Sequence, residues 1–244
     1  MICCDDVALS DASEPDARPI PTPPIPLCPT LHSMITQAGR APLVLASASP
    51  RRRALLTDLG ASFTATAVLV DESALPGESA SDYVGRVAMR KARAAGKSHA
   101  GSWILAADTT VEVDGLIFGK PQDIAGARAM LVRLSGRTHR VLTAVVLLAP
   151  GGRVEVNEAV TAEVRFRRLA ATEIERYVAT PEPFDKAGGY GIQGTARRFV
   201  ENVAGSYTAV VGLPMELVES ALRSRGLLDV PSADRGKTTA GGTT

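Results

Sequence analysis

The chain has 244 residues, of which 45% are hydrophobic and 22% charged, and this composition suits one large or two small globular domains. No apolar run approaches the roughly 20 residues of a membrane span, and the acidic start MICCDDVALSD lacks the basic segment of a signal peptide. The three cysteines all lie before residue 29, which leaves the rest of the chain without a disulfide framework or a cysteine metal site. We therefore expect a cytoplasmic protein that is neither secreted nor inserted in a membrane.

The two ends of the chain differ in composition from its middle. Residues 1–41 contain the proline-dense stretch ARPIPTPPIPLCP, and residues 229–244 are rich in small and polar residues, so we expect a disordered arm and a disordered tail. Met34 is an alternative start of the protein. One domain would then span residues 42–228, which carry a net charge of +4 because the arm carries −3 and the tail is neutral. This bias is too small to predict binding to duplex nucleic acid, but it suits a pocket for a small polyanion.

Residues 43–60, LVLASASPRRRALLTDLG, predict a short buried strand, a turn of small residues and a helix. Ser49 is a suitable N-cap, and Pro50 suits the first helical position. Three arginines at residues 51–53 crowd the first turn, where the helix dipole would favour acidic residues instead. They are either solvated or part of a phosphate site at the helix N-terminus. The misplaced charge favours the phosphate site.

A Thr- and Val-rich strand is predicted over residues 61–70, and a helix capped by Ser79 or Ser81 follows a turn. Lys91 lies on this helix, where a lysine is most often solvated. The apolar run 103–107 predicts a second short strand that ends at Asp108. In open α/β sheets, ligands bind beyond the carboxyl ends of strands.

Asp108 is therefore a candidate to hold a metal or activate water, with the capping of a turn as an equally weighted alternative. An Asp114-Gly115 hairpin comes next. Lys120 lies between a glycine and a proline that restrict its backbone, although a solvated lysine is the default interpretation.

The remaining segments of the chain predict further strands and helices, which together make a mixed sheet with flanking helices. Residues 137–148 form a predicted strand, and residues 160–166 alternate between apolar and polar side chains, as a half-exposed strand does. Thr172 is the expected cap of another helix, and two helical pieces are expected around a break at Pro214.

The glycine-rich stretch DKAGGYGIQG at residues 185–194 can bring its backbone close to a ligand, but such a pattern alone has low specificity. Within it, Lys186 could meet phosphate, and the amide of Gln193 could contact the edge of a base. No zinc-ligand spacing, Walker-type loop or GxSxG motif is present, and His139 begins a strand, which favours a structural role. Nucleophilic triad chemistry therefore has no good candidate.

Five segments in this order resemble the Maf (septum-formation) family of nucleotide pyrophosphatases. They are SASPRR at 47–52, AADTTV at 106–111, GKP at 119–121, DKAGGYGIQG at 185–194 and GSYTAVVGLP at 205–214. The resemblance implies a twisted mixed α/β sheet, two lobes around a cleft, and a fold related to the inosine triphosphate pyrophosphatases. It also implies hydrolysis of a nucleoside triphosphate to its monophosphate and pyrophosphate with Mg²⁺ or Mn²⁺. The GYGIQG form is similar to the branch acting on dTTP and UTP, and a homodimer is plausible on the same ground.

The resemblance also implies residue roles. Asp108 matches the proton acceptor. The positions linked to substrate choice are Arg51, Thr109 and Gln193, and the basic residues around the triphosphate are Lys91, Lys120 and Lys186. Ser47, Ser49 and Arg51 would hold the phosphates, with Arg52 as a helper. The metal ligands are not assigned; Glu72 is either a second carboxylate for the metal or an exposed acid in a turn.

Two alternatives stay open. The first is a non-catalytic nucleotide- or nucleic-acid-binding regulator of cell division, and the second is an enzyme that removes modified nucleotides. Asp108 speaks against the first, because a carboxylate beside phosphates repels them unless a metal intervenes. We therefore expect a nucleoside triphosphate as the partner and no stable complex with nucleic acid.

Overall fold

The computed structural model describes residues 40–228, so the predicted tail and nearly all of the predicted arm lie outside the described residues. Within this range seven strands form one sheet in the order β2-β1-β3-β5-β6-β7, and β4 pairs with β3. The strands are β1 (Leu43–Ala46), β2 (Phe63–Thr66), β3 (Trp103–Val113), β4 (Leu116–Phe118), β5 (Thr138–Leu148), β6 (Val154–Phe166) and β7 (Val200–Ala204). β1 runs parallel to β2 and β3 and the other pairs are antiparallel, which confirms the predicted mixed sheet.

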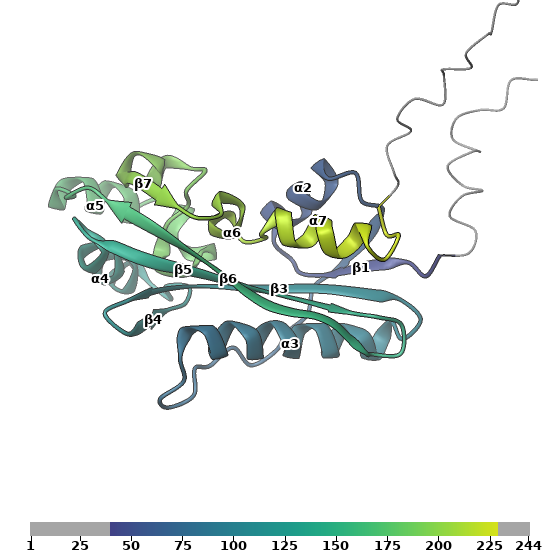
Figure 1. The fold of residues 1–244 in the computed structure, drawn as a ribbon. Coiled ribbons are helices and arrows are strands. Elements are labelled where there is room, and N and C mark those ends of the chain that lie inside the picture. Colours follow the sequence, from purple (N-terminus) through teal and green to yellow (C-terminus); the bar gives the residue numbers. More distant parts are fainter. Residues whose placement is uncertain (1–39, 229–244) are drawn as a thin grey trace, which may run out of the picture. The chain divides into compact units, whose positions relative to one another are not determined.

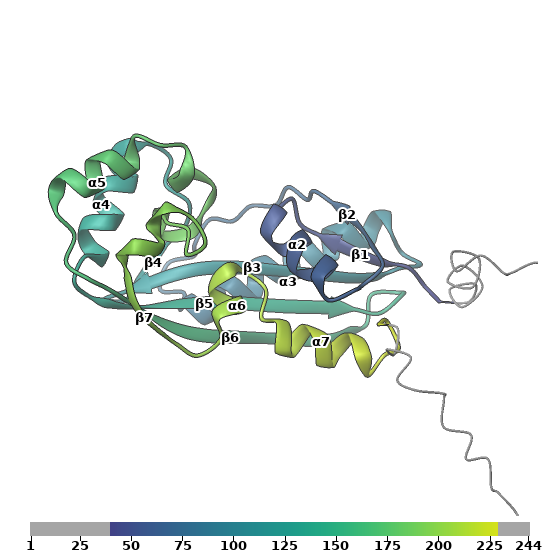
Figure 2. The same cartoon turned by 90° about the horizontal axis from the view of Figure 1, so that it is seen from above.

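Helices cover both faces of this sheet (Figure 1). They are α2 (Pro50–Asp58), α3 (Ala80–Ser98), α4 (Ile124–Leu134), α5 (Ala171–Val178), α6 (Tyr207–Val211) and α7 (Met215–Arg223), with 3₁₀ turns η1 (Glu182–Asp185), η2 (Ala187–Gly189) and η3 (Thr195–Phe199). α3 lies along one face, whereas α2 and α7 lie over the other, and α4 and α5 lie together near β7 (Figure 2). The predicted α/β class is confirmed. Among the described residues, no helix is both long and apolar enough to span a membrane.

Alternation along β3 lets this strand serve both faces of the sheet. Ile104 and Ala106 belong to the apolar cluster beneath α3, whereas Leu105 and Ala107 belong to the cluster with α2 and α7. Successive side chains of a strand point to opposite faces, so a continuous apolar run fits a strand that is covered on both sides. The same alternation sends Asp108 toward α3 and Thr109 toward α2.

The prediction that the strand ends at Asp108 is wrong. β3 continues to Val113, and Asp108 lies opposite Ala144 in the antiparallel ladder with β5. The parallel partner on the other side is shorter, since the pairing of β1 with β3 stops at Leu45 opposite Leu105. Asp108 therefore lies inside β3 but beyond the carboxyl end of β1. The rule that ligands bind at strand ends applies here through β1.

Local signals predicted most helix starts. The N-caps whose side chains accept a hydrogen bond from the first turn are Ser49, Ser79, Asp123 and Ser206. α5 differs, because its N-cap is Ala170 and Thr172 lies inside the first turn; the Glu173 carboxylate instead accepts the Ala170 amide at 3.1 Å. The strand expected over residues 61–70 covers only Phe63–Thr66, since the neighbouring strand β1 also ends there.

Candidate active site

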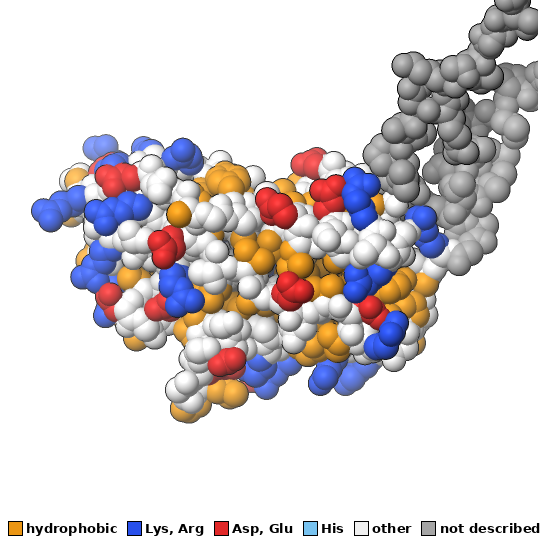
Figure 3. Space-filling model, in the orientation of Figure 1, with side chains coloured by type: hydrophobic (Ala, Val, Ile, Leu, Met, Phe, Trp, Pro, Cys, Tyr) orange, Lys and Arg blue, Asp and Glu red, His pale blue; other side chains and the backbone are white. Residues whose placement is uncertain are grey.

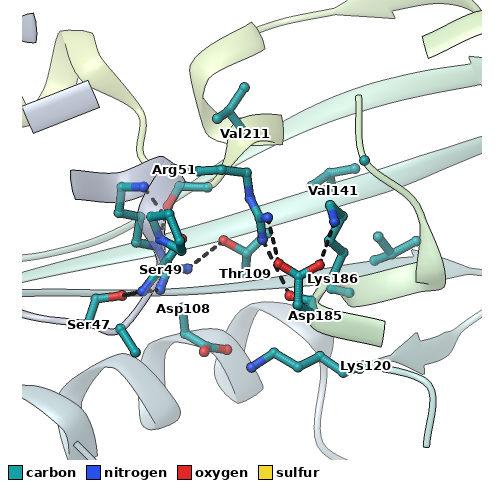
Figure 4. A pocket seen from close by; sticks show the side chains of 18 of the residues that line it. Ser47, Ser49, Arg51, Asp108, Thr109, Lys120, Val141, Asp185, Lys186 and Val211 are labelled. Atoms are coloured by element: carbon teal, nitrogen blue, oxygen red, sulfur yellow. Dashed lines mark hydrogen bonds and ion pairs between the residues drawn. The ribbon is translucent and has the colours of Figure 1, made fainter. Parts of the chain in front are cut away.

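A cavity of about 400 Å³ opens beyond the carboxyl end of β1. It is lined by all ten residues that the sequence predicts to bind substrate or act in catalysis. They are Ser47, Ser49, Arg51, Arg52, Lys91, Asp108, Thr109, Lys120, Lys186 and Gln193. These side chains come from the β1–α2 turn, α3, β3, the segment after β4 and the loop before η3 (Figure 4). The fold therefore brings them together, while their individual roles remain predictions.

The β1–α2 turn forms one wall of the cavity. Ser47 Oγ accepts the Ser49 amide at 3.2 Å, and Ser49 Oγ accepts the Arg52 amide at 3.4 Å as the N-cap of α2. Pro50 occupies the first helical turn, where its missing N–H has no partner to lose. These contacts place the positive end of the α2 dipole at the cavity, and such a helix start attracts anions.

The three consecutive arginines lie in three different environments. Arg51 is partly buried and donates to Asp185 Oδ2 at 2.9 Å, across the cavity mouth (Figure 4). Arg52 is buried and also lines the cavity. Arg53 is exposed and is not part of the lining.

Arg52 joins three segments of the chain through its guanidinium. Its Nε donates to Gly212 O at 2.7 Å, Nη2 donates to Thr109 Oγ1 at 2.9 Å, and Nη1 donates to Ser47 Oγ at 3.3 Å. Burial lowers the pKa of Arg52 and the Asp108 carboxylate opposes this, although a guanidinium stays charged at neutral pH. Thr143 continues the network, since it contacts Thr109 and donates to the Ala209 carbonyl.

Asp108 and Lys91 form a buried ion pair on the other face of β3. Lys91 Nζ lies 2.6 Å from Asp108 Oδ1 and 2.7 Å from Glu72 Oε1. The default interpretation of Lys91 as a solvated residue is therefore wrong, because only 9% of this residue is exposed. Burial raises the pKa of Asp108 above its ordinary value, while the Lys91 ammonium acts in the opposite direction. A carboxylate with a raised pKa is a stronger base than an exposed aspartate.

Glu72 was the less favoured of the acidic candidates, yet its side chain lines the cavity beside Lys91. The sequence left Glu72 as either a second carboxylate for the metal or an exposed acid in a turn. Its position depends on Tyr83, whose hydroxyl donates to the Glu72 carbonyl at 2.9 Å. Glu72 precedes Tyr83 by eleven residues, and no local sequence pattern signals a contact of this kind.

The glycine-rich loop forms the opposite wall. Gly188 has a φ of +70°, and an added Cβ would lie 2.8 Å from Val111 Cγ2, so both backbone shape and space require glycine there. Lys186 donates to the Glu182 carbonyl at 2.7 Å and also pairs with Asp185. Gln193 is exposed at the cavity rim. Asp185 is the acidic group that sequence reasoning left without a role.

Lys120 reaches the site from the segment after β4. Its side chain is exposed and points toward Asp108 (Figure 4). With Arg51 and Lys186 it surrounds the cavity with positive charge, as binding of several phosphate groups requires.

The carboxylates suit a metal that arrives with a phosphate ligand. The described residues contain no group of three or more His, Cys, Asp or Glu side chains that could hold an ion alone. Mg²⁺, however, is usually held by one or two carboxylates together with phosphates and water. Asp108 and Glu72 share contact with one ammonium and so lie close enough to serve as that pair. The residues present therefore fit Mg²⁺ or Mn²⁺ bound together with a nucleotide.

Comparison with known proteins identifies the family of this chain. The profile of the Maf-like protein family matches residues 42–225. A dTTP/UTP pyrophosphatase of Hahella chejuensis is 50% identical over 180 residues, which cover 72% of this chain and 89% of that protein. A dTTP/UTP pyrophosphatase of Myxococcus xanthus is 48% identical over 190 residues, which cover 78% and 95%.

Among solved structures, the Staphylococcus aureus Ham1 protein aligns with a TM-score of 0.44 and 14% identity, covering 75% of this chain and 98% of that chain. Family membership rests on the profile match and the curated relatives, which span most of the described residues at about half identity. The chain belongs to the Maf family.

Proposed function

We propose that this protein hydrolyses dTTP and UTP to the monophosphate and pyrophosphate. The observation that carries the proposal is the buried Asp108–Lys91 pair inside a cavity whose other walls offer arginine, lysine and a helix N-terminus. Relatives at about half identity are named dTTP/UTP pyrophosphatases, which supports the choice of substrate. The homodimer and the cytoplasmic location stay predictions from sequence.

In this proposal the phosphates lie against the β1–α2 turn. Ser47, Ser49 and the first amides of α2 donate hydrogen bonds, and Arg51 offers paired donors at the cavity mouth. Lys120 and Lys186 neutralise the remaining charge. Groups fixed in this way stabilise charge that develops on the phosphate oxygens without having to rearrange.

Asp108 accepts the proton of the attacking water. Lys91 holds the Asp108 carboxylate in place at 2.6 Å. Asp108 and Glu72 are the residues that would hold Mg²⁺ or Mn²⁺. Such an ion lowers the pKa of bound water and offsets phosphate charge.

Gln193 lies near the C-terminal end of the glycine-rich loop and lines the cavity. It is the candidate for contact with the base. The loop also places Tyr190 and Ile192 in the lining, and Val141 and Val211 add apolar surface. An apolar wall with a few polar groups suits a pyrimidine ring, including the methyl group of thymine.

The rival function, a module that only binds nucleotide or nucleic acid, is less well supported. Such a module gains nothing from a buried carboxylate beside its phosphate site. Basic and acidic side chains are also interspersed on the face drawn in Figure 3, where a nucleic-acid-binding surface would gather basic ones. Removal of modified nucleotides uses the same chemistry and differs only in the base that fits.

The test is the Asp108→Asn variant, assayed for pyrophosphate release from UTP and dTTP with Mg²⁺ or Mn²⁺. We expect kcat to fall on the order of 10²- to 10⁴-fold, as loss of a general base does, while binding of UTP stays within a few-fold. Asp58→Asn on the exposed face of α2 is the matched control and should keep full activity. Near-native turnover in Asp108→Asn would contradict the assignment, and a wild type inactive on all triphosphates would favour the binding module.

A further inference from the structure

The turn that carries Gln193 is organised around one carboxylate outside the predicted site. Glu182, in η1, accepts the Thr195 amide at 3.0 Å through Oε2 and the Ala196 amide at 3.4 Å through Oε1. Both amides belong to the start of η3, directly after the Gln193-Gly194 pair. A carboxylate that accepts backbone amides at a helical start is among the stronger hydrogen-bonding arrangements.

The same carboxylate is tied to the other side of the turn through Tyr177. The Tyr177 hydroxyl donates to Glu182 Oε1 at 3.2 Å, and the backbone N–H of Gly191 lies near enough to the hydroxyl to act on the pKa of Tyr177. Tyr177 is 1% exposed and packs edge-on against Phe199 with ring centroids 5.2 Å apart, so it is a rigid anchor in the core. Residues 191 and 195–196 are thus held to one buried point, with Gln193 between them.

Glycines leave the space that this arrangement needs. A Cβ added at Gly194 would overlap the Glu182 carboxylate, although the φ angle there would tolerate any residue. A Cβ at Gly191 would lie 2.6 Å from Lys186 Cε and 3.2 Å from Glu182 Oε1. Part of the glycine pattern seen in the sequence therefore makes room for Glu182, beyond any close approach to a ligand.

A fixed turn matters because the amide of a glutamine is symmetric in shape. Rotation by 180° exchanges its oxygen and nitrogen, so a loosely held Gln193 could pair with uracil or with cytosine, whose edges carry opposite donors and acceptors. Backbone N–H and C=O groups cannot make this exchange. Discrimination between these bases therefore needs the turn itself to be held in one position.

We propose that Glu182 is a positioning residue for base selectivity, which fixes the Gly191–Ala196 turn so that it accepts uracil and thymine and rejects cytosine. This inference rests on the proposed function, since it assigns the base-contacting part of the same cavity. Glu182 also accepts a hydrogen bond from Lys186, but through its backbone carbonyl at 2.7 Å. A change in the Glu182 side chain leaves that phosphate-side contact in place.

The experiment compares Glu182→Gln, Gly194→Ala and the double variant with wild type, using UTP and CTP. Glu182→Gln keeps the shape of the side chain but places an NH₂ group where the Thr195 and Ala196 amides donate to the carboxylate. Gly194→Ala keeps every hydrogen-bonding group of Glu182 but displaces its carboxylate. Glu175→Gln is the matched control, since that glutamate binds Arg128 on the surface at 2.5 Å and 2.7 Å.

We expect the UTP/CTP ratio of kcat/KM to fall about tenfold or more in both single variants, mainly through a higher KM for UTP. The double variant should resemble the single ones, because both remove the same contact. Inhibition by inorganic tripolyphosphate, which has no base, should stay within twofold of wild type. A purely structural role for Glu182 would weaken tripolyphosphate binding and kcat together.

An unchanged UTP/CTP ratio in folded Glu182→Gln would overturn the inference, and Gly194→Ala decides it if Glu182→Gln does not fold. A wild type that hydrolyses neither triphosphate would instead overturn the proposed function. In that case, calorimetry measures the affinity of wild type and of the variants for UTP and for CTP in the presence of Ca²⁺. The inference requires that wild type binds UTP more tightly than CTP and that the variants lose this preference. Binding of neither nucleotide by wild type would reject both proposals.

Discussion

Arg51, Arg52 and Arg53 are identical in type and consecutive in sequence, yet each does something different. A helix turns by about 100° per residue, so neighbouring side chains point to different surroundings. Arg51 points to the cavity mouth, Arg52 into the interior and Arg53 to solvent. The charge at the wrong end of the helix is thus partly structural, because Arg52 uses its fork of donors to join the β1–α2 turn, β3 and the end of α6.

The Arg52→Lys variant tests this division. Lysine keeps the charge but offers no planar fork, so it cannot reach the Gly212 carbonyl and Thr109 hydroxyl together. We expect the free energy of unfolding to fall by roughly 2 kcal/mol, the cost of leaving buried partners without a charged donor. Urea unfolding followed by circular dichroism measures this, with the exposed Arg53→Lys as control. Equal stability of the two variants would show that Arg52 has no such joining role.

At the scale of elements, α3 determines the shape of a segment that has neither helix nor strand. Three consecutive carbonyls between β2 and α3 each accept a side-chain donor from the helix at 2.9 Å. The pairs are Arg90 to Asp71 O, Tyr83 to Glu72 O and Arg86 to Ser73 O. Arg86 is held in turn by both Glu78 carboxylate oxygens at 2.6 Å. The helix therefore presents the Glu72 carboxylate to Lys91 and to the cavity.

Removing the Tyr83 hydroxyl should affect Glu72 while the aromatic ring of residue 83 stays in the cavity lining. In Tyr83→Phe, the Glu72 carbonyl loses its hydroxyl donor, and we expect the KM for Mg²⁺ to rise about fivefold, the effect of one hydrogen bond. kcat at saturating Mg²⁺ should stay within twofold. Initial rates across a Mg²⁺ titration give both values, with Tyr207→Phe on the exposed side of α6 as control. A loss of kcat that no Mg²⁺ concentration restores would contradict the role proposed for Glu72.

Elements with local signals were predictable, and contacts between distant segments were not. The Asp114-Gly115 hairpin is confirmed, with φ angles of 52° and 75°, because two residues determine such a turn. The continuation of β3 through Asp108 was missed, since it depends on the length of β1 and the register of β5. Glu182 was missed and the contacts of Glu72 were not predicted for the same reason, since the Ala196 amide and the Tyr83 hydroxyl lie 14 and 11 residues away from them.

At the scale of the whole molecule, the cavity is assembled from segments between residues 46 and 212. The Arg51–Asp185 pair links two walls of the cavity, and the hydrogen bonds of Arg52 join three of its segments. Because the site exists only when the whole sheet has formed, a nucleotide that binds it stabilises the domain globally. Buried titratable groups that contact the walls of the cavity then make the stability of the domain depend on pH.

His139 is the buried group whose protonation links the site to pH. It lies on β5 with 2% exposure, and its Nε2 is 2.8 Å from the hydroxyl of Tyr190 in the glycine-rich loop. Within residues 40–228, its Nδ1 has no hydrogen-bond partner. Burial lowers the pKa of His139 to about 4, as expected for a ring between Phe166 and Tyr190. The burial of this histidine in β5 suits the structural role that the sequence predicts.

The lowered pKa predicts a stability that falls in mild acid. The unfolded chain takes up the His139 proton as the pH drops through about 6.5, while the folded chain resists until about 4, so acid favours unfolding in this window. His139→Phe keeps an aromatic ring and removes the titration. From pH 7 to pH 5, we expect wild type to lose roughly 2 kcal/mol more unfolding free energy than the variant. Urea unfolding at both pH values measures this, and equal losses would mean that the folded protein does not lower the pKa of His139.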